Sequence, residues 1–92
     1  MRGRGEFIQV VVIDKAPYNL YWDASIWPYT LTAVNNDGKN VTKCYYGTNF
    51  HFSQAKHGYT IEEIRALPEL AVRMAEIYSR LYEDSKLVYR HE

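Results

Sequence analysis

Hydrophobic and polar positions along the chain first follow strand patterns and then repeat at helical spacing. Glu6 to Asp14 (EFIQVVVID) is rich in β-branched residues and predicts a strand buried on both faces. Ile26 to Val34 (IWPYTLTAV) and Val41 to Tyr46 (VTKCYY) predict two more strands with alternating side chains. Between them, NNDGKN at 35–40 predicts a hairpin, because Asn, Asp and Gly tolerate the positive φ angles of tight turns.

Proline and lysine positions bear on the edges of this sheet. Pro17 predicts that the first strand is followed by a break, because proline cannot donate a hydrogen bond to a ladder. Pro28 predicts an edge strand or a bulge at its end of the second strand. Pro28 and Lys43 would both blunt an exposed edge, and a homodimer through a sheet edge is one possible assembly.

The last third of the chain predicts helices that cover the sheet. In GYTIEEI, residues 58–64, Thr60 and Glu63 form a capping box, in which each side chain bonds the backbone amide of the other residue. Gly58 suits a left-handed cap that closes a short helix over Ser53 to His57.

Pro68 lies inside the helical pattern and predicts a boundary between two helices. The first would cover Ile61 to Ala66, and the second would run from Pro68 to about Asp84. Lys86 to Tyr89 fits either a helical extension or a last short strand. The second helix carries an apolar stripe at spacings of three and four, formed by Leu70, Met74, Ile77, Tyr78 and Leu81.

These elements predict an α+β fold, with a three- to four-stranded antiparallel sheet covered on one face by C-terminal helices. The 92 residues suffice for one domain, 6–92, preceded by a flexible basic tail, 1–5. The single cysteine excludes an intramolecular disulfide, and no apolar run has the length of a signal peptide or a membrane span, so we expect a cytoplasmic protein. The formal net charge is zero, which is not typical of nucleic-acid-binding domains.

Few residues suggest catalysis or metal binding. Cys44, His51 and His57 are of the residue types that form thiol nucleophiles or metal sites, but they match no zinc-binding or nucleophile motif. Glu62 and Glu63 resemble paired acid–base carboxylates, yet their place in a first helical turn favours a capping role. We therefore expect no catalytic residue, no metal and no cofactor.

A nucleic-acid-binding alternative rests on SQAKHGYTIEEIRAL, residues 53–67, which has the outline of a helix-turn-helix. About ten of these residues resemble the G-(F/Y)-(S/T)-(I/L)-EEI segment of MerR-type regulators, and the Gly-x-Thr-x-Glu-Glu pattern resembles the start of the covering helix in HicB-like antitoxins. Such likenesses imply a DNA-binding regulator or an antitoxin, although the two glutamates would face phosphates unfavourably. The phosphate contacts would be Arg2, Arg4, Lys56 and Arg65.

The main functional signal is a surplus of aromatic side chains. Aromatics make up 15% of the chain, more than a small core needs, and both tryptophans lie within residues 16–31. Because Trp and Tyr dominate interface hot spots, we expect a non-enzymatic inhibitor or adaptor that occludes a surface of a larger protein or protein–nucleic-acid complex. Size, neutrality and composition resemble the small inhibitors that bacteriophages use against host defence, anti-CRISPR proteins among them. The expected partner-binding residues are Tyr18, Tyr21, Trp22, Trp27, Tyr29, Tyr45 and Tyr46.

Overall fold

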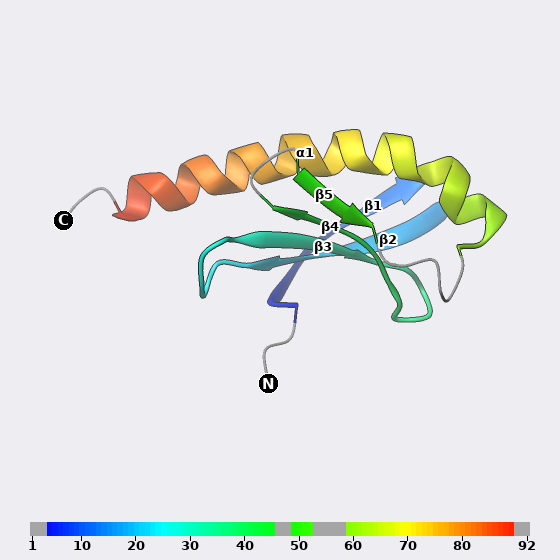
Figure 1. Cartoon of the computed structure of the whole chain (residues 1–92), viewed down its shortest axis with the longest axis horizontal. Helices are drawn as coiled ribbons and strands as arrows, with labels where there is room; N and C mark the ends of the chain where they lie inside the picture. The colour runs from blue at the N-terminus through cyan, green and yellow to red at the C-terminus, as the bar shows by residue number, and fades with distance from the viewer. Residues whose placement is uncertain (1–3, 46–48, 53–58, 90–92) are drawn as a thin grey trace.

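The computed structural model describes residues 4–45, 49–52 and 59–89. It confirms the α+β class: one antiparallel sheet is covered on one face by a C-terminal helix, which packs against strands of the sheet (Figure 1). The elements are β1 (Glu6–Ile13), β2 (Ala16–Asp23), β3 (Thr30–Val34), β4 (Asn40–Tyr45), β5 (Asn49–Phe52) and α1 (Ile61–Tyr89).

The sheet is a meander with strand order β1-β2-β3-β4-β5, so every strand pairs with its neighbours along the chain. Four strands of five to eight residues are extended by the four-residue β5. The predicted hairpin at 35–40 joins β3 to β4. There the Asn35 side chain accepts hydrogen bonds from the backbone N–H groups of Asp37 and Lys39, and Gly38 takes a φ of 81°.

The prediction was wrong about the break after the first strand. The chain turns at Asp14 and Lys15, whose φ values of 52° and 68° form a two-residue hairpin, and it continues directly into β2. Pro17 lies within β2, two residues before the first β2–β3 pair, Asn19 with Val34. Its missing N–H therefore costs no bond to β3, which is why the proline is tolerated.

Two further expectations about the sheet are corrected. The strand expected from Ile26 begins only at Thr30, so Pro28 lies in the β2–β3 connection. Pro28 and Lys43 consequently blunt no edge, because β3 and β4 are interior strands. Nor is β1 buried on both faces: Phe7, Val10 and Val12 are about half exposed, whereas Val11 and Ile13 are buried. We call the side that carries Phe7, Val10 and Val12, away from α1, the open face.

One helix, α1, replaces the two that Pro68 predicted. Pro68 and the residue one turn before it, Ile64, are both exposed, so the Ile64 carbonyl that loses its helical partner can bond water. Figure 1 shows the first turns of α1 set at an angle to the rest, as expected near a proline. Lys86 to Tyr89 belongs to this helix; the expected short helix over Ser53 to His57 and its Gly58 cap lie outside the described residues.

The core lies between the sheet and α1. The predicted helical stripe faces it, with Leu70, Met74, Ile77 and Tyr78 buried and Leu81 partly buried. The sheet contributes Val11, Ile13, Tyr18, Leu20, Leu31, Ala33, Val41 and Cys44. At roughly 1.5 to 3 kcal/mol for each large side chain, this burial is the main source of stability.

Candidate partner-binding surface

Five aromatic rings from β2, the β2–β3 connection and α1 form one contiguous group, which we call the ring cluster. Its members are Trp22, Trp27, Tyr29, Tyr78 and Tyr82. Centroid distances run from 5.2 Å for Trp22–Tyr78 to 6.2 Å for Tyr78–Tyr82, with most pairs edge-to-face or tilted. These are the favoured arrangements of aromatic pairs, each contributing about 0.5 to 1.5 kcal/mol beyond area burial.

The ring cluster is fixed to the core at its inner end. Tyr78 is buried, and its hydroxyl donates a 2.8 Å hydrogen bond to the backbone carbonyl of Tyr29. Trp22 is partly buried and packs on the core, with its ring 5.9 Å from that of Tyr29. The helix and the β2–β3 connection are thus held together through aromatic side chains.

The outer end of the cluster is exposed. Ile26 and Trp27 have 53% and 54% of their surfaces open to solvent, and we call this pair the Ile26–Trp27 tip. The Trp27 ring nevertheless lies 5.3 Å from that of Tyr29 and 6.1 Å from that of Tyr82. Because its inner side already packs against these two rings, the exposed indole loses little conformational freedom when a partner covers it.

Asp23 shapes the connection that carries the tip. Its buried carboxylate accepts hydrogen bonds from both the backbone N–H of Ser25, at 3.0 Å, and the Ser25 hydroxyl, at 2.6 Å. This is an Asx-type turn, which fixes the chain where it leaves β2. The Ile26–Trp27 tip is therefore held on its N-terminal side by the Asp23–Ser25 turn and on its C-terminal side by the contact of Trp27 with Tyr29.

The structure separates the residues expected to bind a partner. Trp22, Trp27 and Tyr29 are brought together in the ring cluster. Tyr18 does not join them: with 2% of its surface exposed it lies in the core, where burial raises the pKa of its hydroxyl, so its side chain is not on the exposed surface.

Two other expected residues lie elsewhere on the sheet, and one cannot be placed. Tyr21 pairs with Phe7, ring centroids 5.7 Å apart, on the open face. Tyr45 is half-buried at the end of β4, opposite Thr30. Tyr46 lies outside the described residues.

The sequence pattern did not indicate that Ile26, Tyr78 and Tyr82 contribute to the ring cluster and its tip. Ile26 falls in the strand predicted from 26 to 34, Tyr78 in the predicted core stripe, where it is indeed buried, and Tyr82 in no predicted site. The available signal was the spacing of Tyr78 and Tyr82, four residues apart on one helix face, where two rings can stack.

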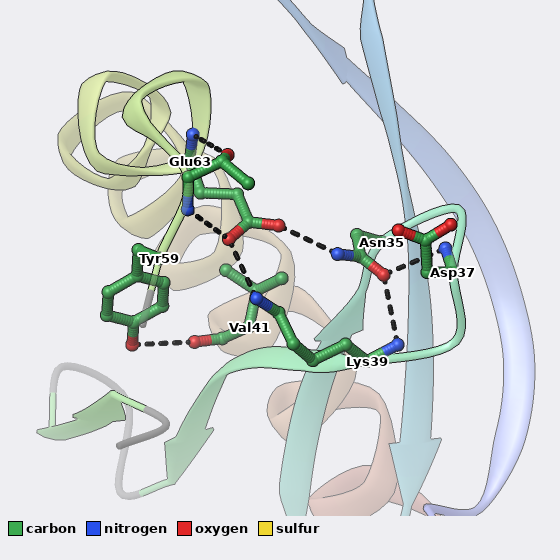
Figure 2. Close-up of polar contacts among 7 residues, drawn as sticks. Asn35, Asp37, Lys39, Val41, Tyr59 and Glu63 are labelled. Carbon is green, nitrogen blue, oxygen red and sulfur yellow. Dashed lines mark hydrogen bonds and ion pairs between the residues drawn. The ribbon is translucent and has the colours of Figure 1, made fainter. Parts of the chain in front are cut away.

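A polar cluster ties the start of α1 to the β3–β4 hairpin (Figure 2). The predicted capping box is present: Glu63 N–H donates to Thr60 Oγ1, and Thr60 N–H donates to Glu63 Oε1, both at 3.1 Å. The same carboxylate accepts bonds from Asn35 Nδ2, at 2.7 Å, and from Lys39 Nζ, at 3.0 Å. Figure 2 shows Tyr59 beside it, donating to the Val41 carbonyl at 3.1 Å.

The electrostatics of Glu63 favour a structural role for this cluster. Burial alone would raise the pKa of Glu63, but hydrogen bonds from Asn35, Lys39 and the Thr60 N–H, with the Lys39 charge, outweigh it and lower the pKa. An ionised, fully bonded carboxylate is a poor general acid or base at neutral pH. The adjacent hollow has a volume of about 140 Å³, smaller than the roughly 300 Å³ of a typical small-molecule site.

The possible thiol nucleophile is inaccessible. Cys44 is buried between sheet and helix, and burial raises the pKa of its thiol to about 12, so no thiolate is available near neutrality. The backbone of His51 belongs to β5, where His51 pairs with Lys43, one position along from the Cys44–Phe50 pair. His57 lies outside the described residues, and within those residues no three metal-ligating side chains are grouped.

The predicted phosphate contacts are not assembled in the described part of the chain. Arg4 bonds the Gly38 carbonyl and the Asn40 side chain, and its guanidinium lies 5.3 Å from the Tyr21 ring centre. Arg65 is exposed on the second turn of α1, while Arg2 and Lys56 lie outside the described residues. From Ile61 on, the helix-turn-helix-like segment is the beginning of one long helix that packs on the sheet.

Comparison of the chain with protein families, with curated proteins and with solved structures finds no match. Within the ranges that the structure describes, no helix is both long enough and apolar enough to cross a membrane.

Proposed function

We propose that this protein is a non-enzymatic binding module, an inhibitor or adaptor that occludes a surface of a larger protein. The observation that carries the proposal is the Ile26–Trp27 tip, an apolar pair more than half exposed on an ordered aromatic base. Tryptophan is among the residue types most enriched in interface hot spots.

A folded protein with an apolar pocket is the partner that suits this tip. Single-stranded nucleic acid would need cations beside the rings. Arg4, one of the predicted phosphate contacts, lies over the ring of Tyr21. Tyr21 and Trp22 are successive residues of β2, so their side chains point to opposite faces of the sheet. Arg4 and Trp22 are therefore on different sides of the sheet.

The mode of action that follows is occlusion, in which a small domain covers a working surface of its partner. Small bacteriophage inhibitors of host defence remain the analogy for it, on size and composition. A homodimer through a sheet edge is compatible with this mode, because the tip belongs to neither edge strand.

The proposal is tested by capture with matched variants. The tagged wild-type protein and the Trp27→Ala and Ile26→Ser variants are incubated with extract of the native host, and bound proteins are identified by mass spectrometry. We expect one partner to be retained by the wild type and lost from both variants, since removing a hot-spot tryptophan costs about 2 kcal/mol or more. Val72→Ala, at an exposed valine on α1, is the control and should retain the partner.

Direct titration of the purified partner then separates binding from folding. We expect Trp27→Ala to weaken the affinity about 30-fold or more while its circular-dichroism melt stays near that of the wild type. Equal affinity of the wild type and Trp27→Ala for the captured protein would contradict the proposal.

A further inference from the structure

β1 forms one edge of the sheet, and in the described part of the chain no strand pairs with its outer side. Its eight residues include neither proline nor lysine, the residue types that commonly keep edge strands from pairing. A bulge at Ile8 interrupts the register, because Phe7 pairs with Tyr21 and Gln9 with Leu20. The regular part of the edge is therefore Gln9 to Ile13.

The β1–β2 hairpin determines which backbone groups of this edge point outward. With a two-residue turn at Asp14 and Lys15, Ile13 and Ala16 form the hydrogen-bonded pair that closes the hairpin. Hydrogen-bonded and non-hydrogen-bonded pairs alternate along an antiparallel ladder, so the N–H and C=O groups of Val10 and Val12 point away from β2. Pro17 opposite Val12 agrees with this phase, since that position of β2 donates nothing to β1.

This edge is complementary to itself. Val11 is the midpoint of Gln9 to Ile13, and the two outward-pointing residues, Val10 and Val12, flank it. If two copies pair antiparallel about Val11, Val10 of each copy meets Val12 of the other, and every outward N–H and C=O of these residues finds a partner. The contact is isologous, as a two-fold dimer requires.

The charges at the ends of the edge favour the antiparallel arrangement. Arg4 and Glu6 precede the regular segment, and Asp14 and Lys15 follow it. Antiparallel pairing brings Glu6 of one copy to the Lys15 end of the other, whereas parallel pairing would place Glu6 beside Glu6. The exposed Phe7, Val10 and Val12 side chains of both copies would then share one continuous open face.

From these observations we propose that the protein is a homodimer in which β1 pairs with β1 of a second copy, antiparallel and centred on Val11. The two five-stranded sheets continue into one another through this contact. The assembly does not involve the Ile26–Trp27 tip, so this proposal and the proposed partner binding can be tested separately.

Light scattering on the full chain over a concentration series tests the assembly. We expect twice the mass of one chain, and a shift toward the single-chain mass in Val12→Pro. That substitution removes two outward N–H donors per dimer, so association should weaken about tenfold or more. Val12→Ala, which keeps the N–H, should remain dimeric. A single-chain mass at every concentration, or a Val12→Pro dimer as tight as the wild type, would overturn the proposal.

Cross-linking provides a second readout that does not depend on how Val12→Pro folds. Val10 of one copy would face Val12 of the other in a hydrogen-bonded pair, where Cα atoms lie about 5.5 Å apart, within disulfide range. Both side chains lie on the exposed open face, so a thiol at either position is accessible to an oxidant. Under an added oxidant, an equimolar mixture of Val10→Cys and Val12→Cys should give a covalent dimer that migrates at double mass without reductant, and each variant alone should give much less. The wild type is a further control, because its buried Cys44 should give none. No cross-link in the mixture of the two folded variants would exclude this register.

Discussion

Two tryptophans five residues apart have opposite structural roles. Trp22 points from β2 toward the helix and packs on Tyr78, whereas Trp27 stands at the outer end of the same cluster with half of its surface in water. Composition alone cannot separate them, because both belong to the same aromatic stretch. The pairing of Trp22 with Leu31, a fully buried residue of β3, determines its inward orientation.

The two alanine variants should therefore differ in stability. We expect Trp22→Ala to lower the free energy of unfolding by about 2 to 3 kcal/mol, because it leaves a void beside Tyr78. Trp27→Ala should cost less, about 1 kcal/mol, because it removes the ring contacts with Tyr29 and Tyr82 while half of the indole surface is already in water. Urea denaturation of both variants measures this, and equal losses would contradict the assigned roles.

Glu63 gives the molecule a specific acid sensitivity. The pKa of its carboxyl is lowered in the folded protein, so the folded state favours the ionised form more than the unfolded state does. The stabilisation is fully present above the ordinary pKa of a glutamate and is lost as the pH falls through the lower, folded pKa.

In Glu63→Gln the corresponding part of the acid dependence should disappear. At neutral pH we expect a loss of about 1 to 3 kcal/mol, because Lys39 loses its charged partner and the cap at Thr60 weakens. Melting temperatures of wild type and Glu63→Gln, measured from neutral pH down to about pH 3, should converge at the acid end. A constant gap over this range would show that the Glu63 charge does not contribute.

At the scale of elements, α1 is continuous despite Pro68. Tertiary packing explains this, because the stripe from Leu70 to Tyr78 is buried on the sheet and the capping box holds the first turn to the β3–β4 hairpin. Proline then imposes a bend on an exposed side of the helix instead of ending it.

Pro68→Ala should stabilise the protein. The new N–H can bond the Ile64 carbonyl at an exposed position, and alanine is about 3 kcal/mol more favourable than proline inside a helix, so we expect a gain of about 1 to 3 kcal/mol. Thermal unfolding followed by circular dichroism measures the gain, with Val72→Ala, one turn later, as the control. A lower melting temperature for Pro68→Ala would show that the bend is needed for packing on the sheet.

Elements whose hydrogen bonds are local could be predicted from the sequence. The hairpin at 35–40 and the capping box at Thr60 each depend on residues within five positions of one another. β2 could not, because its strand character depends on pairing with β1 and β3 on both sides, and Pro17 is tolerated only because β3 ends before it.

The residues of the ring cluster likewise include some that the sequence could predict and one that it could not. Trp22, Trp27 and Tyr29 were expected together because they are close in sequence. Tyr78 reaches the Tyr29 carbonyl across 49 positions, a contact that no local pattern specifies.

At the scale of the whole molecule, helix and sheet enclose a single core layer, and Cys44 lies within it. A reagent reaches this thiol only when the helix separates from the sheet. Cys44 is thus a natural reporter of global opening.

Alkylation of native Cys44 should be far slower than that of an exposed thiol and should accelerate in parallel with urea unfolding, since burial raises the pKa of Cys44 to about 12. Mass spectrometry of the labelled protein follows the reaction, and Asn36→Cys, at an exposed turn position, supplies the fast reference. Rapid labelling of Cys44 under native conditions would contradict its enclosure.

The order of the strands along the chain also determines when the apolar interior is hidden during synthesis. Each strand can pair with its predecessor as soon as it leaves the ribosome, so the sheet can grow hairpin by hairpin. Its inner side, with Leu20, Leu31 and Val41, stays uncovered until the last third of the chain emerges. A ribosome that stalls before the helix codons would therefore leave the apolar side of the sheet accessible to chaperones and proteases.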